Sequence, residues 1–245
     1  MGQQISKQES KEEENNHLKK DLKVLESDLL QPLDVQFLSS HIHNNWPWRL
    51  AFSTLDQGKS WTAFCSCLNN LQESIIVIKD HQGHVFGGFA SSPWKKSPGF
   101  YGNSSCFLFT CFPAQNIYHA SGYNQNFQYL AFDYKSLPNG LGFGGQINYF
   151  ALFLSQDFEN GMCRSEPFSS TFYNPMLSSC ADFKIAEVEV WSVRDIEKDD
   201  RLLSKEDAKK SILDGNSIES SILEMAGKTM HSKNLTNPPR EDEPI

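Results

Sequence analysis

The 245-residue sequence lacks long apolar runs, a surplus of basic residues and paired cysteine motifs. No run of 18 apolar residues is present, which argues against a transmembrane helix. No apolar stretch follows Met1, so we expect no secretory signal. The chain has 22 Lys and Arg against 30 Asp and Glu, a formal net charge of −8. A nucleic-acid-binding protein needs a basic face, so nucleic acid is not an expected partner.

Motifs of common catalytic and metal chemistry are also missing. The sequence has no G-x-S-x-G, no H-E-x-x-H and no P-loop lysine. The six cysteines form no C-x-x-C pair, and Cys65-x-Cys67 is too tight for a zinc knuckle without a second pair. His81-x-x-His84 beside Asp80 could bind a metal, but a polar turn explains it more simply. We predict reduced thiols, no enzyme, no cofactor and no metal site.

The distribution of charge divides the chain into three parts. Residues 1–34 hold 5 Lys and 8 acids, and residues 194–245 hold 9 Lys and Arg and 12 acids. The 159 residues from 35 to 193 hold only 8 Lys and Arg and 10 acids, and they contain every Phe, Tyr and Trp. Aromatic residues supply a large apolar core. We therefore predict one folded domain over 35–193 between two charged flanks, and a monomer.

Residues 35–193 have the pattern of short β-strands. Aromatic or β-branched runs at 75–79, 85–90, 106–112 and 149–154 predict strands, with a hairpin around 80–84. Residues 183–193 predict another strand. Its apolar residues Ile185, Val188, Val190 and Val193 share one face only if a bulge follows Ala186.

One helix interrupts this pattern. Trp61, Phe64, Leu68 and Leu71 recur at helical spacing, and Ser60 is a suitable N-cap. Many short strands with few helices are typical of an α+β domain built on an antiparallel β-sandwich flanked by helices.

A glycine-rich segment matches G-x-G-x-x-G, with glycines at Gly140, Gly142, Gly144 and Gly145. A dinucleotide-binding loop must follow a strand and open a helix. This segment follows Pro138 and runs toward a predicted strand, so we expect a tight glycine turn with close backbone packing. Glu189 and Trp191, in the last predicted strand, are likewise assigned to architecture.

The first residues fit the N-myristoylation motif M-G-x-x-x-[ST], with Gly2 as the acceptor. A single myristoyl chain binds membranes only marginally. Residues 1–23 carry five Lys and five acids, and the nearest cysteine is Cys65, so neither a polybasic patch nor a nearby palmitate is available. Firm membrane attachment would need a protein partner. Leu18–Leu29 has helical spacing, and Pro32 is expected to end that helix.

Two helices are expected after residue 193. Ser204–Asp207 resembles a capping box, and a second helix is expected from Ser217 to Gly227. Their apolar stripes either cover the domain or bind a partner. The residues proposed to bind a partner are Ile212, Leu213, Ile218, Ile222 and Leu223. The end of the chain is expected to be a disordered tail.

Several segments resemble the TLDc family in order and spacing. They are Trp48–Ser53, Val85–Ala90, Cys106–Phe109, Gly140–Gln146 with Tyr149–Leu152, and Phe183–Trp191. Lys210–Asp214, beyond the domain, resembles the lysosomal member of the family. Within the family, the chain resembles the lysosomal member linked to mTOR signalling, which also opens with a Met-Gly myristoylation signal. That member carries a longer helical region before its TLDc domain than this chain does.

The resemblance implies a β-sandwich with no established catalysis that binds the V-ATPase and is linked to oxidative-stress protection or mTOR signalling. Our hypothesis is a lipid-anchored interaction module, cytoplasmic and peripheral on the lysosomal or vacuolar membrane. Two alternatives stay open. One is an enzyme or redox protein of oxidative stress, which needs an exposed thiol of low pKa beside a base. The other is a lipid-anchored scaffold without V-ATPase contact.

Overall fold

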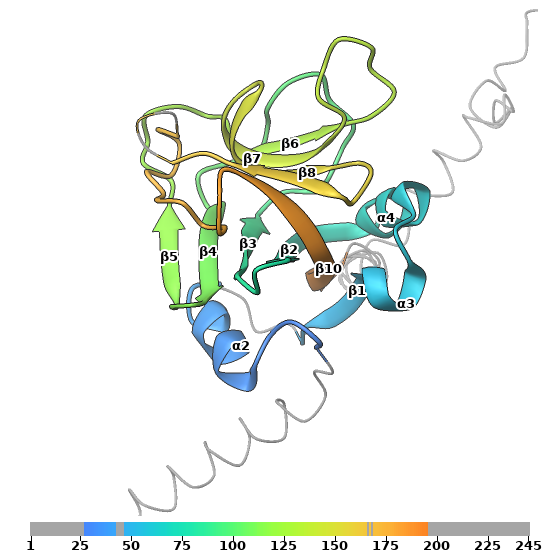
Figure 1. The fold of residues 1–245 in the computed structure, drawn as a ribbon, viewed down its shortest axis with the longest axis vertical. Helices are drawn as coiled ribbons and strands as arrows, with labels where there is room; N and C mark the ends of the chain where they lie inside the picture. The colour runs from blue at the N-terminus through green and yellow to red at the C-terminus, as the bar shows by residue number, and fades with distance from the viewer. Residues whose placement is uncertain (1–26, 43–46, 166, 168, 196–245) are drawn as a thin grey trace, which may run out of the picture. The chain divides into compact units, whose positions relative to one another are not determined.

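The computed structural model describes residues 27–42, 47–165, 167 and 169–195 (Figure 1). The described helices are α2 (Pro32–Ser39), α3 (Thr54–Gln57) and α4 (Trp61–Leu68). The strands are β1 (Arg49–Ser53), β2 (Leu71–Asp80), β3 (Val85–Ala90), β4 (Phe107–Phe112), β5 (Asn116–His119), β6 (Gln128–Ala131), β7 (Gly140–Gln146), β8 (Tyr149–Ser155), β9 (Asn160–Cys163) and β10 (Asp182–Asp195). No helix of these described ranges is long and apolar enough to cross a membrane.

The strands pair antiparallel in the order β5-β4-β3-β2-β10-β9-β8-β7-β6, with β1 added on β10. Strand β10 serves both halves of the sheet. Its first residues, Asp182–Lys184, pair with β9, whereas the stretch from Ile185 onward pairs with β2. The sheet therefore folds over on itself, and the predicted antiparallel β-sandwich flanked by helices is confirmed.

Strand β10 contains the expected bulge. Its register against β2 shifts between Ile185 and Glu187, so Ala186 is the extra residue. Ile185, Val188 and Val190 then share the core between the two halves. Val193 lies on the opposite face with Trp191, so the bulge unites three of the four apolar residues rather than all four.

Three apolar layers are present in the described residues, and the smallest, on β6 and β8, consists of Tyr129, Ala131, Phe150 and Phe153. The inner layer between the two halves is largely aromatic, with Phe86, Phe143 and Phe183 fully or almost fully buried. The second layer lies on the outer face of the β2–β3–β4 half. Leu29, Leu30, Val35 and Leu38, from residues 27–42, are buried within it. We call residues 27–42 the N-terminal strap.

Helix α4 follows the prediction at its start but not at its end. The Ser60 hydroxyl accepts a hydrogen bond from the Ala63 N–H, as an N-cap does. The helix ends at Leu68, and Leu71 is the first residue of strand β2. The extension of the helix to Leu71 was wrong because Asn69 caps the helix and Leu71 pairs with Asp195.

The glycine-rich segment is a strand and not a turn. Residues Gly140–Gln146 form β7, and the reversal comes at Ile147–Asn148. Glycine is needed for close packing instead: a Cβ on Gly142 would lie 2.8 Å from a Phe150 ring carbon. The expected close packing is present. The expected turn was wrong because these residues pair as a strand with β6 and β8.

The N-terminal flank also differs from the expectation. Pro32 is the first residue of helix α2 rather than the end of an earlier helix, and the preceding residues 27–31 are not helical. Proline suits a first helical position because the N–H it lacks would have no helical partner there. Gly2, the other residues of 1–26 and both C-terminal helices lie outside the described residues.

Candidate functional site

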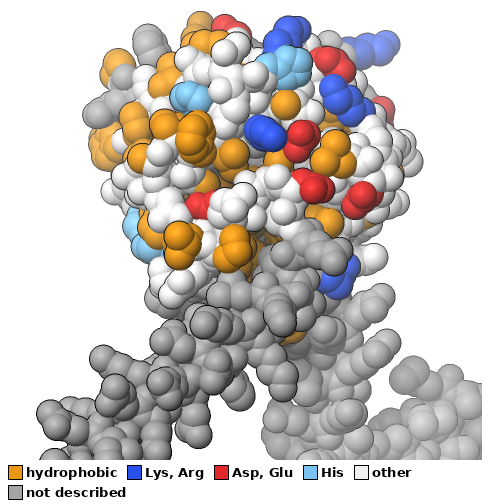
Figure 2. Space-filling view, turned by 60° about the horizontal axis from the view of Figure 1, so that its bottom comes forward, with side chains coloured by type: hydrophobic (Ala, Val, Ile, Leu, Met, Phe, Trp, Pro, Cys, Tyr) orange, Lys and Arg blue, Asp and Glu red, His pale blue; other side chains and the backbone are white. Residues whose placement is uncertain are grey.

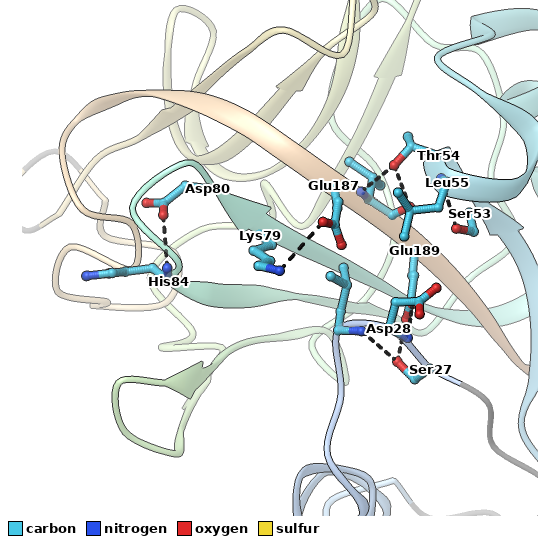
Figure 3. Close-up of polar contacts among 12 residues, drawn as sticks. Ser27, Asp28, Ser53, Thr54, Leu55, Lys79, Asp80, His84, Glu187 and Glu189 are labelled. Atoms are coloured by element: carbon cyan, nitrogen blue, oxygen red, sulfur yellow. Dashed lines mark hydrogen bonds and ion pairs between the residues drawn. The ribbon is translucent and has the colours of Figure 1, made fainter.

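The side chain of Glu189 fixes the N-terminal strap to strand β10 (Figure 3). Its carboxylate is buried and accepts three hydrogen bonds: from the Ser27 hydroxyl at 2.6 Å, the Asp28 N–H at 2.8 Å and the Trp191 indole N–H at 2.9 Å. A buried carboxylate is tolerated when such donors replace water. With its oxygens engaged in this way, Glu189 acts as a structural clasp.

Ser27 is the strap's half of this clasp. While it donates to Glu189, its hydroxyl oxygen accepts hydrogen bonds from the N–H groups of Leu29 and Leu30 at 3.2 and 2.8 Å. The hydroxyl thus shapes the local turn and joins that turn to the sheet. Sequence reasoning missed Ser27, because nothing in its neighbourhood marks a partner on a strand far along the chain.

Further along the strap, Asp34 makes the next side-chain hydrogen bonds. One carboxylate oxygen accepts from the Gln31 N–H at 2.9 Å and helps to cap helix α2, while the other accepts from the Gln115 amide at 2.7 Å. Within the described ranges, no backbone-to-backbone hydrogen bond joins the strap to a strand. The strap is therefore held by side-chain contacts and apolar burial alone.

A groove of about 390 Å³ lies between the strap and the ends of β2, β3 and β4. Its rim carries Asp28, Lys79 and two exposed apolar side chains, Leu33 (71% exposed) and Phe112 (55% exposed). Lys79 faces Glu187 at 3.6 Å. Figure 2, in which the bottom of Figure 1 comes forward, shows orange hydrophobic side chains gathered at the left and mixed charges at the right. This face presents no basic patch among the side chains drawn in colour.

The predicted polar turn at His81–His84 is organised by Asp80. The buried Asp80 carboxylate accepts hydrogen bonds from the N–H groups of Gln82, His84 and Ser179, each at 2.9 Å. Burial alone raises the pKa of Asp80, but the bonds from Ser179 and His84 outweigh it and the net pKa is lowered. In the part of the chain that the structure describes, no cluster of three or more His, Cys, Asp or Glu could hold a metal.

Four of the described thiols have a raised pKa, which is the opposite of what a redox centre needs. Burial, with a smaller effect of the Asp133 charge, raises the pKa of Cys65 to about 11. Burial likewise raises the pKa of Cys106, Cys111 and Cys163, and all three side chains are buried. A thiol with a raised pKa is a poor nucleophile at neutral pH. Cys106 and Cys111 are buried within the apolar clusters of the sandwich.

The glycines predicted as a structural motif lie against aromatic side chains and neighbouring strands. A Cβ on Gly140 would meet the Leu154 carbonyl oxygen and the Phe153 ring. Strand β7 continues through a two-residue turn into strand β8, where a dinucleotide site would need the start of a helix. Trp191, the other motif residue, packs near Trp48, with ring centroids 6.5 Å apart. These positions serve packing and not phosphate binding.

Comparison with known proteins agrees with this architecture. The TLDc domain profile matches residues 20–194. The chain belongs to the TLDc family. Relatives named mTOR-associated protein MEAK7 are 40% identical in Danio rerio, over 80% of this chain and 43% of the relative, and 36% identical in Homo sapiens, over 87% and 46%. The chain thus spans less than half the length of these relatives.

A second group of relatives is named oxidation resistance protein 1. The one from Rattus norvegicus is 35% identical over 68% of this chain and 19% of its own length. The TLDc chain described here is therefore similar both to proteins named for mTOR association and to proteins named for oxidation resistance.

Proposed function

We propose that this chain is a non-enzymatic interaction module, held on the lysosomal or vacuolar membrane by a myristoyl group on Gly2 and by contact with the V-ATPase or an mTOR-linked assembly. The observation that carries the proposal is the TLDc match over residues 20–194 together with relatives named for mTOR association. The M-G-x-x-x-S start adds the lipid.

The buried polar groups support a module without catalysis. The carboxylates of Glu189 and Asp80 each accept three hydrogen bonds from the protein itself, so neither is placed to accept a substrate proton. The three buried thiols, at Cys106, Cys111 and Cys163, have raised pKa values and are therefore not activated. Because these carboxylates and thiols are occupied or buried within the domain, a role in binding other proteins fits the structure better than catalysis.

The N-terminal strap would connect a lipid on Gly2 to the sandwich. Residue 27 is hydrogen-bonded to β10, so a membrane-bound Gly2 would be joined to the sandwich through the intervening residues alone. A weak lipid contact and a weak protein contact on one chain strengthen each other through effective concentration. This explains how one myristoyl chain without basic support serves a peripheral protein.

The redox alternative is favoured by one observation, the similarity to relatives named oxidation resistance protein 1. It predicts that the purified chain consumes peroxide in the presence of a thiol reductant. The raised pKa values of Cys65, Cys106, Cys111 and Cys163 argue for no activity above a sample in which every cysteine is replaced by serine. Turnover well above that control would favour the enzyme.

Membrane sedimentation tests the proposed function. Myristoylated protein and the Gly2→Ala variant are incubated with isolated lysosomal membranes and with protein-free liposomes made from the same lipids. We expect the lipidated chain to bind the membranes much better than the liposomes, and Gly2→Ala to lower binding several-fold. Equal binding to both would favour a lipid-anchored scaffold without V-ATPase contact. If Gly2→Ala binds the membranes as well as the myristoylated protein does, a lipid on Gly2 does not contribute to membrane binding.

A further inference from the structure

Three loops at one end of the sandwich carry most of the exposed large apolar side chains. They are residues 121–127 after β5, residues 145–149 around the β7–β8 turn, and residues 169–176 before β10. The first and third run side by side at the upper left of Figure 1. Four of the seven exposed large apolar residues in the described chain belong to them: Tyr123 (76%), Tyr149 (53%), Tyr173 (47%) and Met176 (39%).

Buried Thr171 joins all three loops. Its hydroxyl accepts a hydrogen bond from the Gly145 N–H and donates one to the Asn124 side-chain oxygen, both at 2.9 Å. Its carbonyl accepts from the Ser121 N–H at 2.8 Å, and the Ser121 hydroxyl donates to the Ser170 carbonyl at 2.6 Å. The loops are thus bonded directly to one another, which reduces the ordering entropy that binding would cost.

The glycine pair at Gly144 and Gly145 allows this approach. Both have positive φ, +63° and +78°, a region that other residues rarely adopt. A Cβ on Gly144 would lie 2.7 Å from the ring of Phe172, which packs directly against this glycine. The Gly145 carbonyl accepts from the Asn126 amide at 2.7 Å. The second half of the glycine motif therefore seats the loop 169–176.

The backbone beneath Tyr173 is fixed in an uncommon conformation. Tyr173 has φ +46°, which costs free energy for a residue with a bulky side chain. Its neighbour Asn174 is fully buried; the Asn174 side chain accepts from the Ser169 hydroxyl at 2.6 Å and donates to the Arg164 carbonyl at 3.0 Å. These bonds hold a strained turn that leaves the Tyr173 ring in solvent.

The loops are uncharged as well as rigid. Residues 113–132, 140–156 and 169–181 contain no Asp, Glu, Lys or Arg. Anionic lipid and nucleic acid require basic residues, which these loops do not have. Tyr, Asn, Ser and Gly dominate instead, the composition of protein-binding loops in which rigid tyrosines supply contact area and small polar groups supply hydrogen bonds.

We propose that Tyr123, Tyr149, Tyr173 and Met176 form a preorganised docking surface for an uncharged face of a partner protein. The proposal rests on the proposed function and deepens it, since it assigns this surface to the contact with the V-ATPase. The lack of charge on these loops favours an uncharged partner face. Such a face can lose its water against the loops without leaving a buried charge unpaired.

Binding of purified V-ATPase to the chain without myristate tests the surface. The affinity for purified V-ATPase is measured for wild type, for a Tyr123→Ser/Tyr173→Asn variant and for a Leu55→Ser/Phe112→Ser control. Asn tolerates positive φ, so the turn at 173 is kept. The control removes two apolar side chains of similar exposure from outside the three loops. We expect the tyrosine variant to bind at least tenfold more weakly, the control to bind within twofold of wild type, and all three to melt alike.

The outcomes separate the two proposals. If wild type binds and the tyrosine variant binds equally well, the docking surface is refuted and the proposed function stands. If wild type does not bind the V-ATPase, the V-ATPase contact in the proposed function fails and the docking surface fails with it. Phosphatidylserine-containing vesicles are the remaining probe. Binding of the unmyristoylated chain to them, lost in the tyrosine variant, would assign the loops to lipid and overturn the proposal.

Discussion

The hydroxyl of Ser27 lies 2.6 Å from a carboxylate oxygen of Glu189, although 162 residues separate the two in the chain. This bond places the start of the described chain on the strand that joins both halves of the sandwich. The sandwich and the N-terminal flank are therefore one structural unit from residue 27 onward. Whatever is attached upstream is mechanically connected to β10.

Replacing Glu189 by Ala tests the clasp. The change leaves the Ser27 hydroxyl, the Asp28 N–H and the Trp191 indole N–H without their acceptor, so we expect a loss of about 2–4 kcal/mol of unfolding free energy. Hydrogen exchange in residues 27–42 should rise. Glu187→Ala, on the same strand but in a surface ion pair, is the control, with an expected change under ~0.5 kcal/mol. Equal effects of the two changes would contradict a clasp at Glu189.

Asp80 predicts part of the acid sensitivity. Its folded-state pKa is lowered, so the carboxylate contributes stability above its unfolded pKa of ~3.9, and this contribution is lost as the pH falls through the folded value. Asp80→Asn should cost about 1–3 kcal/mol at pH 7 and flatten the fall in unfolding free energy below about pH 4. Denaturant titrations between pH 7 and pH 2 measure both. A slope identical to that of wild type would show that other groups carry the acid dependence.

Gly142→Val tests the packing of the glycine strand. The added side chain would meet the Phe150 ring at 2.8 Å and the Leu152 carbonyl at 3.3 Å, so we expect a loss of about 2–4 kcal/mol or failure to fold. Gly99→Val, where no atom lies within 4 Å of the added Cβ, is the matched control and should melt near wild type. Calorimetry of the wild-type chain should detect no NAD or ATP binding. Tight binding would reopen the dinucleotide interpretation.

Alkylation of the native protein tests the state of the thiols. With a pKa of about 11, Cys65 carries on the order of one thiolate in a thousand at pH 8, and buried Cys106 and Cys163 are inaccessible as well. Exposed Cys180 should be labelled first. Mass spectrometry of iodoacetamide-treated protein at pH 8 identifies the sites. Rapid labelling of Cys65 or Cys106 before Cys180 would support a reactive thiol and the redox alternative.

Local patterns allowed much of the sandwich to be predicted. The runs now seen as β2, β3, β4, β8 and β10 are apolar and bounded by turn residues, and the bulge after Ala186 could be placed because strand side chains alternate. The helix at Trp61 was visible from its spacing and its Ser60 cap. These features depend on residues that are close together in the sequence.

The remaining features depend on contacts between distant residues. The glycine segment was expected to be a turn because it follows Pro138 and runs toward a predicted strand. A glycine-rich strand is explained by the side chains and backbone packed against it, among them the rings of Phe150 and Phe153, which no local sequence pattern places against these glycines. The Ser27–Glu189 clasp and the Thr171 network join loops through single side chains, which leave no periodic pattern. For the same reason, the sequence did not predict that Tyr123, Tyr149, Tyr173 and Met176 lie on loops that contact one another.

The most direct test of the account is recovery of partners from lysosomal membranes. Myristoylated chain is captured with its bound proteins, identified by mass spectrometry, and compared with a chain that ends before Ser204 and so lacks the predicted partner-binding residues Ile212, Leu213, Ile218, Ile222 and Leu223. We predict strong enrichment of V-ATPase subunits with the full chain, and their loss after truncation without a large fall in melting temperature. Absence of V-ATPase subunits from the full-chain capture would contradict the central claim.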